Sequence, residues 1–159
     1  DWLSRDGVQR TVGRIAGEIA AKQLYRQGQY NAVQHLLKGN TVPEFWFIRV
    51  SSSYRLALEV PKSNRARGKS LRAVQKTIES YARFLQRYPQ GVSGFEAELE
   101  SDMSNGRKFV AQLHQQSQPK DYVRRVEALF SDSELIKYTP HEKSRDGVIG
   151  NILRVFGKR

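Results

Sequence analysis

The residues best able to do chemistry lie between Pro61 and Ile78, a stretch with six basic side chains and no acidic one. The six are Lys62, Arg65, Arg67, Lys69, Arg72 and Lys76. Uncompensated positive charges repel one another, so such a run is stable mainly when it is solvated or faces an anion. The chemistry is therefore electrostatic binding, and we predict an anionic partner for this stretch.

A second motif lies inside the same run. Gly68, Lys69 and Ser70 resemble the end of a phosphate-binding P-loop, but Ser63 stands where that motif needs glycine, and no strand precedes it. Nucleotide hydrolysis is therefore not expected here. We expect Ser70 to cap a helix whose free backbone N–H groups, beside Arg67 and Lys69, hold a phosphate group; the alternative is a solvated loop.

The overall charge supports an anionic partner. The 159 residues include 27 Lys and Arg against 16 Asp and Glu, a net charge of +11. Residues 1–89 carry 16 basic and 6 acidic side chains, whereas residues 90–159 carry 11 and 10. The excess is therefore expected to form one positive face, with Arg10 and Arg14 of the first helix contributing to it. Such a face attracts nucleic-acid backbones, acidic proteins or anionic lipids.

Nothing in the sequence favours catalysis, a metal site, a cofactor or a small-molecule ligand. The chain has no cysteine, and its three histidines lie far apart, at positions 35, 114 and 141. Glu96, Glu98, Glu100 and Asp102 form an acidic cluster, but alternate spacing on a helix spreads them over different faces. They are interpreted as a solvated face or as partners for basic groups. We predict a binding protein and not an enzyme.

The two ends of the chain resemble each other. Residues 4–8, SRDGV, recur as residues 144–148, and Val12 and Ile15 correspond to Ile152 and Val155 at the same offset. One interpretation is a docking helix used twice, to hold partners or to join subunits; the other is a favourable capping sequence that arose twice. The docking interpretation assigns partner contacts to Ser4, Asp6, Val8, Ser144, Asp146, Val148, Ile152 and Phe156.

Apolar periodicity places these residues on helices. Helices are expected at residues 2–27, 29–38, 41–58, 70–88, 94–116, 120–130 and 147–156, with a basic connector at 61–68 and an irregularity at Asn105-Gly106. Residues 45–50 alternatively form a buried strand, but the apolar pattern continues to Leu58, beyond a usual strand length. The fold expected is all-α, a single-domain bundle or short helical array of six to seven helices. Residues 1–138 form the basic domain, and residues 139–159 form a linker and an amphipathic docking helix.

Two segments resemble the tetratricopeptide-type helical repeat. Residues 23–32, QLYRQGQYNA, are similar to the turn of that repeat, and residues 73–89, AVQKTIESYARFLQRYP, to its second helix and closing proline. The resemblance covers about a third of the chain, and the spacing between the segments departs from the period of ~34 residues. It implies closely packed helix pairs and an array that binds peptides in a groove.

The functional expectations follow from charge. First, the chain is a nucleic-acid-binding subunit that contacts phosphates; second, an adaptor whose basic face meets acidic proteins; third, a peripheral membrane protein in which residues 147–159 lie on an anionic surface. No apolar run approaches the ~20 residues of a membrane-spanning helix, so a soluble protein is expected. The chain begins with Asp1, which indicates a processed product or an excised piece. The compartment stays undetermined.

Overall fold

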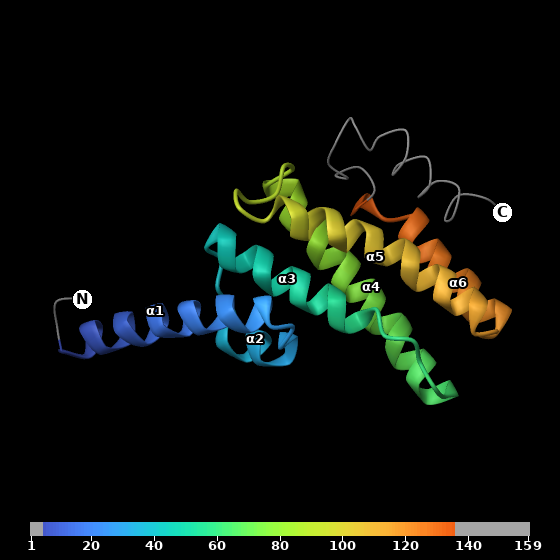
Figure 1. Ribbon diagram of the computed structural model, residues 1–159, viewed down its shortest axis with the longest axis horizontal. Helices are drawn as coiled ribbons and strands as arrows, with labels where there is room; N and C mark the ends of the chain where they lie inside the picture. The colour runs from blue at the N-terminus through green and yellow to red at the C-terminus, as the bar shows by residue number, and fades with distance from the viewer. Residues whose placement is uncertain (1–4, 136–159) are drawn as a thin grey trace. The chain divides into compact units, whose positions relative to one another are not determined.

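The computed structural model describes residues 5–135, which form six α-helices joined by short turns (Figure 1). No strand occurs in this part of the chain, so the predicted all-α fold is confirmed. Residues 45–50 lie inside the third helix, as preferred over the strand alternative. The helices are α1 (Arg5–Arg26), α2 (Tyr30–Leu36), α3 (Pro43–Ala57), α4 (Asn64–Arg87), α5 (Glu96–Gln115) and α6 (Lys120–Ser131).

The helix ends follow local chemistry. Gly28 and Gly39 stop α1 and α2 with φ values of 78° and 74°, a region that side chains disfavour. Pro43 is the first residue of α3, where its missing N–H costs nothing. Before α3, the side chain of Asn40 accepts a hydrogen bond of 3.0 Å from the backbone N of Val42.

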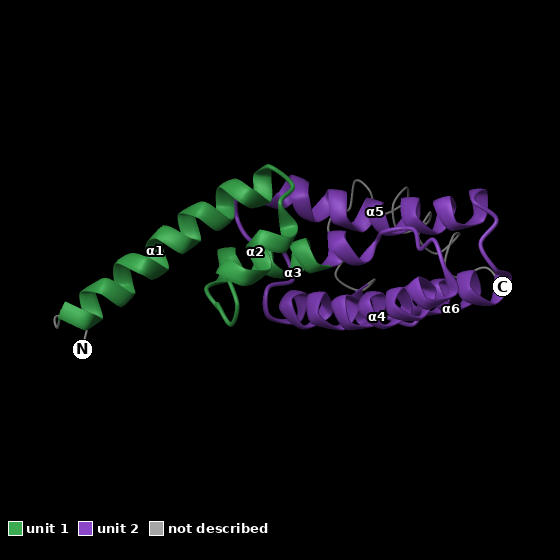
Figure 2. Ribbon diagram, turned by 90° about the horizontal axis from the view of Figure 1, so that it is seen from below, with its two compact units in different colours: residues 1–53 green, residues 54–159 purple. Residues whose placement is uncertain are grey.

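The chain divides into two compact units, residues 1–53 and residues 54–159, coloured separately in Figure 2. The division falls within α3, so this helix contributes residues to both units. The boundary predicted near residue 138, and the predicted helix at residues 147–156, lie outside the described residues. No helix between residues 5 and 135 is both long and apolar enough to cross a bilayer.

Unit 1 is held together around Tyr25, near the end of α1. Its hydroxyl shares a buried hydrogen bond of 2.7 Å with Ser51 Oγ, and its ring makes edge contacts with Tyr30 and Phe47. Only the C-terminal part of α1 is well packed, because Gly7 is the sole buried residue between positions 5 and 20. The stable core of this unit therefore lies where α1 ends, with α2 and the first turns of α3.

Unit 2 is a small bundle in which α6 packs along both α4 and α5. The inner face of α4 buries Val74, Ile78, Tyr81 and Leu85, which repeat at helical spacing as predicted. Phe109 and Val126 contribute from α5 and α6. The apolar side of α4 is thus mostly buried in the core of unit 2.

A charged network crosses the centre of unit 2. Asp102 of α5 is fully buried and accepts hydrogen bonds of 2.7 Å from Arg55 Nε and from the hydroxyl of Tyr81. The ring of Tyr54 contacts Tyr81 edge-on, and burial, reinforced by the charge of Asp102, raises the pKa of Tyr54 above its ordinary value. The network joins α3, α4 and α5 through one carboxylate.

The irregularity predicted at Asn105-Gly106 is wrong, because α5 runs through both residues. Gly106 is buried in a close contact, and a Cβ atom there would lie 2.7 Å from the hydroxyl of Tyr54 and 3.0 Å from Phe130 Cε1. The glycine therefore allows close packing and does not break the helix.

The substitution Gly106→Ala is expected to destabilise the protein by about 1–3 kcal/mol, because overpacking forces Tyr54 and Phe130 to move. The matched control is Gly68→Ala on α4, where an added Cβ meets no atom within 4 Å. There, alanine is expected to stabilise by roughly 0.5–1 kcal/mol, because it lowers the backbone entropy of the unfolded chain. Urea unfolding of both variants checks the contrast, and equal effects would contradict it.

Candidate nucleic-acid interface

The basic run lies mostly on a helix and not in a connector. Helix α4 begins at Asn64, and Ser63 caps it by accepting a 3.1 Å hydrogen bond from the backbone N of Ala66. The predicted connector at residues 61–68 and the predicted cap at Ser70 are therefore wrong. Ser70 lies in the second turn of α4, where backbone N–H groups already bond to carbonyl groups of the preceding turn. The free N–H groups that we expected at Ser70 for binding a phosphate therefore do not occur there.

Helical spacing brings the basic side chains onto one face of α4. At 3.6 residues per turn, six exposed cations fall within an arc of about 60° and extend about 33 Å along the helix. They are Arg65, Lys69, Arg72, Lys76, Arg83 and Arg87, which we call the α4 stripe. The buried residues Val74, Tyr81 and Leu85 lie on the opposite side of the helix, so the stripe points away from the core.

The charges of the α4 stripe are not neutralised by acids in the described part of the chain. The ion pairs of unit 2 there join Arg55 to Asp102 and Arg125 to Asp121, and His114 contacts Glu127; none of these contacts includes a stripe residue. Glu79 is the one acid at the edge of the stripe, and it accepts a hydrogen bond from Gln75. The stripe therefore keeps a net positive charge, with Glu79 beside its widest gap, between Lys76 and Arg83.

Two predicted site residues, Arg67 and Ser70, lie away from the stripe. Arg67 is two positions from Arg65, which places it about 200° around the helix. Its guanidinium donates to Asn64 Oδ1 and to Gln118 Oε1, while Ser70 Oγ shares a 2.9 Å hydrogen bond with the Tyr122 hydroxyl. Burial raises the pKa of Tyr122, although Ser70 and Arg67 both act to lower it. Both predicted residues therefore hold α4 against the start of α6.

Sequence reasoning missed Arg83 and Arg87 as stripe members. Their positions, 18 and 22 residues beyond Arg65, fall within about 40° of Arg65 around the helix, so the signal is present in the spacing. The basic residues between Lys62 and Lys76 lie closer together in the sequence, so the predicted site was confined to them. Arg87 lies over the ring of Tyr88, 5.7 Å from its centre, and Arg83 Nη2 donates to Ser80 Oγ.

The predicted residues of α1 belong to unit 1 and are described separately. Arg10 Nε donates to the Asp6 carbonyl, and Arg14 pairs with Glu18 at 3.4 Å, so its charge is partly compensated. Val8 is 42% exposed and lies in line with the exposed Val12, Ile15 and Ile19. Ser4, Ser144, Asp146, Val148, Ile152 and Phe156 lie outside the described residues, and the docking interpretation stays a prediction.

A groove of about 410 Å³ borders the stripe near its N-terminal end. Its lining is mainly apolar, from the end of α3, the following connector and α4, and its charged residues are Glu59, Lys62 and Lys69. The lining residues include Leu56, Ala57, Val60, Pro61, Ala66 and Ala73. The predicted residue Lys62 is exposed and thus adds charge beside this groove.

The other polar residues of the described part of the chain lie apart or pair with one another. No group of three or more potential metal ligands occurs between residues 5 and 135. Asp102 is buried and pairs with Arg55, so the interpretation of the acidic cluster as partners for basic groups holds for this residue. Glu96 and Glu100 are exposed on α5. His114 contacts Glu127 at 2.6 Å on the surface.

Comparison with known proteins found no relative: no family model, no curated protein and no solved structure matches the chain. The tetratricopeptide-type resemblance therefore stays a prediction. Its first segment spans the Gly28 turn and the Tyr25–Tyr30 contact, and together these form a tight helical hairpin of α1 and α2.

Proposed function

We propose that this protein is a non-enzymatic binding subunit that contacts the phosphate backbone of RNA or DNA through the α4 stripe. The observation that carries the proposal is six exposed cations on one 60° arc, with no ion pair to a described acid. Such cations displace counterions from a polyanion, and this release supplies most of the affinity of sequence-independent binding. Arginine, four of the six, also binds phosphate in a bidentate manner.

The dimensions of the stripe suit an extended polyanion. With a rise of 1.5 Å per residue, successive stripe cations lie about 4.5–10.5 Å apart along α4. A duplex presents phosphates at every 3.4 Å of axis on each strand, so one groove edge offers several phosphates along a helix of this length. A single small anion would use only one or two of the six cations.

Base recognition is not part of the proposal. Single-stranded nucleic acids bind where bases stack on exposed rings between cations. Four tyrosines flank arginines near the end of α1 or of α4. Tyr25 and Tyr81 are buried in the two cores, Tyr30 is half-buried against Tyr25, and Tyr88 is half-buried against Phe84. We therefore expect contacts to phosphates alone and little dependence on base sequence.

A membrane surface is less favoured for this stripe. Peripheral helices bury an apolar face in the lipid, whereas the apolar face of α4 is used by its own core. The large hydrophobic residues that are exposed in residues 5–135 all belong to unit 1: Val8, Val12, Ile15, Ile19, Leu36 and Val42.

An adaptor that binds an acidic protein segment is the second candidate. The apolar groove beside Lys62 and Lys69 favours it, because protein partners use an apolar centre with a charged rim. The substitution Ala73→Phe would fill this groove without changing the charge. It is expected to leave nucleic-acid affinity within about twofold, since phosphate contacts depend on the cations alone.

The test compares two duplexes of equal length and unrelated sequence by fluorescence anisotropy, with anionic liposome flotation in parallel. We expect similar affinities for the two duplexes, because phosphate contacts carry no sequence information. We also expect Ala73→Phe to bind as the native chain does. Binding to liposomes or to polyglutamate, but to neither duplex, would contradict the proposal.

A further inference from the structure

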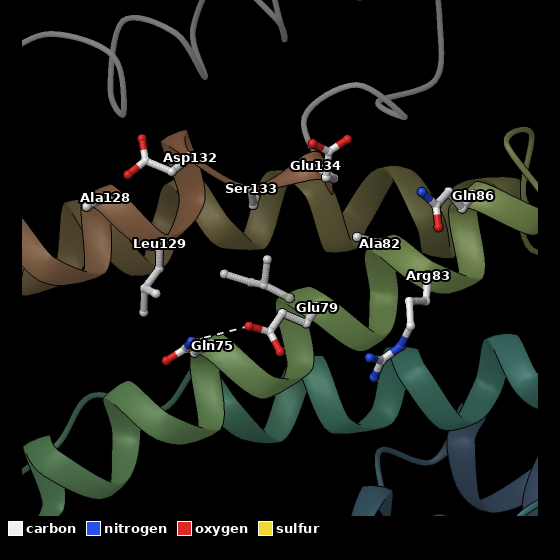
Figure 3. Close-up of a pocket in the computed structure, with 11 residues that line it drawn as sticks. Gln75, Glu79, Ala82, Arg83, Gln86, Ala128, Leu129, Asp132, Ser133 and Glu134 are labelled. Carbon is white, nitrogen blue, oxygen red and sulfur yellow. Dashed lines mark hydrogen bonds between the residues drawn. The ribbon is translucent and has the colours of Figure 1, made fainter.

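A cleft of about 520 Å³ lies in unit 2 between α4 and α6 (Figure 3). Its floor is apolar, from Ile78 and Ala82 of α4 and from Ala128 and Leu129 of α6. In Figure 3, Leu129 points from α6 toward α4. Clefts of 300–1,000 Å³ with apolar linings are typical binding sites, and none of the predicted site residues uses this one.

The rim of the cleft is acidic, in contrast to the chain as a whole. Glu79 stands on the α4 side, and Asp132 and Glu134 stand at the end of α6, where Figure 3 shows them pointing outward. Arg83 is the one basic residue of the lining. An occupant with an apolar centre and basic flanks therefore matches the floor and the rim together.

The sequence supplies such an occupant directly beside the cleft. The described chain ends at Leu135, the residue after Glu134 of the rim. Residues 136–159 carry six basic and two acidic side chains. Within them, residues 147–156 contain six large apolar side chains: Val148, Ile149, Ile152, Leu153, Val155 and Phe156.

Tethering favours this segment over any free partner. The eleven residues 136–146 span up to about 40 Å when extended, which exceeds the length of the cleft-lining part of α4. A short linker gives an effective concentration of the order of millimolar. A weak intrinsic affinity is thus enough for the segment to bind its own cleft before that of another copy.

We propose that residues 147–156 occupy the cleft between α4 and α6 of the same chain. Their apolar side chains cover Ala82 and Leu129, and basic residues flanking the segment face Glu79, Asp132 and Glu134. The inference concerns unit 2 alone and does not depend on nucleic-acid binding.

Disulfide trapping in the full chain tests the proposal, because the protein has no cysteine of its own. The pair Leu129→Cys with Ile152→Cys places one thiol in the cleft and one in the segment. In the control pair, Gln112→Cys on α5 replaces the cleft position; Gln112 is exposed and does not line the cleft. Under mild oxidation at low protein concentration, the cleft pair is expected to form an intramolecular disulfide at least about tenfold faster than the control pair.

Equal rates for the two pairs, or disulfide-linked dimers in place of intramolecular bonds, would overturn the proposal. Ala128→Cys with Ile152→Cys serves as a second cleft pair should Leu129→Cys unfold the chain.

Charge reversal tests whether the acidic rim of the cleft attracts the segment. Asp132→Lys in the cleft pair is expected to slow trapping several-fold, whereas Glu100→Lys, which changes the net charge equally on α5, leaves it unchanged. The same effect from both substitutions would also contradict the proposal.

Discussion

The triple variant Arg72→Ala, Lys76→Ala and Arg83→Ala is expected to bind duplex DNA about 100- to 1,000-fold more weakly than the native chain in 0.1 M salt. Each cation that neutralises a phosphate releases about 0.9 counterions, and its removal corresponds to roughly eightfold in affinity at this salt concentration. Removing three such cations therefore accounts for about 500-fold. All three residues are exposed, so the folded state should change in stability by no more than about 0.5 kcal/mol per site.

The matched control removes the same charge elsewhere in unit 2. Lys108→Ala, Lys120→Ala and Arg125→Ala are exposed sites on α5 and α6 and lie outside the α4 stripe. This control is expected to weaken binding by less than about tenfold, because it lowers only the long-range attraction. If both triple variants weaken binding equally, net charge and not the stripe is responsible. Fluorescence anisotropy with one labelled duplex measures both.

The substitution Asp102→Ala is expected to lower the free energy of unfolding by about 3–5 kcal/mol, the cost of breaking a buried ion pair by removing one partner. Asp102 is fully buried, and it holds Arg55 of α3 and Tyr81 of α4 at 2.7 Å each. Without the carboxylate, both donors are left without this acceptor inside the bundle. The melting temperature should fall by about 6–20 °C for a chain of this length.

Glu100→Ala is the control for Asp102→Ala, since Glu100 lies on the same helix but is exposed. It is expected to change stability by less than about 0.5 kcal/mol. The double variant Arg55→Met and Asp102→Leu should recover most of the stability, because apolar residues of similar volume can replace a buried ion pair. A destabilisation below about 1 kcal/mol for Asp102→Ala would show that the network does not hold the bundle together.

Local patterns in the sequence predicted well where helices form. They predicted poorly which residues share a helix face and which helices contact one another. Apolar spacing placed the C-terminal end of α4 and both ends of α6 within one residue of their observed positions, because each helix buries one face. The start of α4 was misplaced because Ser63 and Ser70 are both good caps, and Gly68 and the charges favoured a loop. Once the helix begins at Asn64, Arg67 must lie away from Arg65, and Arg83 and Arg87 must join the stripe.

Contacts between distant residues were beyond local reasoning. The alternate acids of α5 were interpreted as a solvated face or as partners for basic groups, and nothing local identifies Arg55, 47 residues earlier, as the partner of Asp102. In the same way, the sequence around Gly106 suggested only an irregular helix. The side chains that require a glycine there, Tyr54 and Phe130, come from other helices and cannot be identified from nearby residues. Val8, Val12, Ile15 and Ile19 repeat at helical spacing on α1, but periodicity alone does not show that this line is exposed, because it does not show whether a partner is present.

The salt dependence of duplex binding tests the central claim most directly. The dissociation constant of the native chain for one labelled duplex is measured from low to high salt. With six phosphate contacts from the α4 stripe, the logarithm of the association constant should fall with the logarithm of the salt concentration at a slope near −5, and the stripe variant should reduce that slope by about 3. A slope that stays the same when the stripe cations are removed would contradict the account.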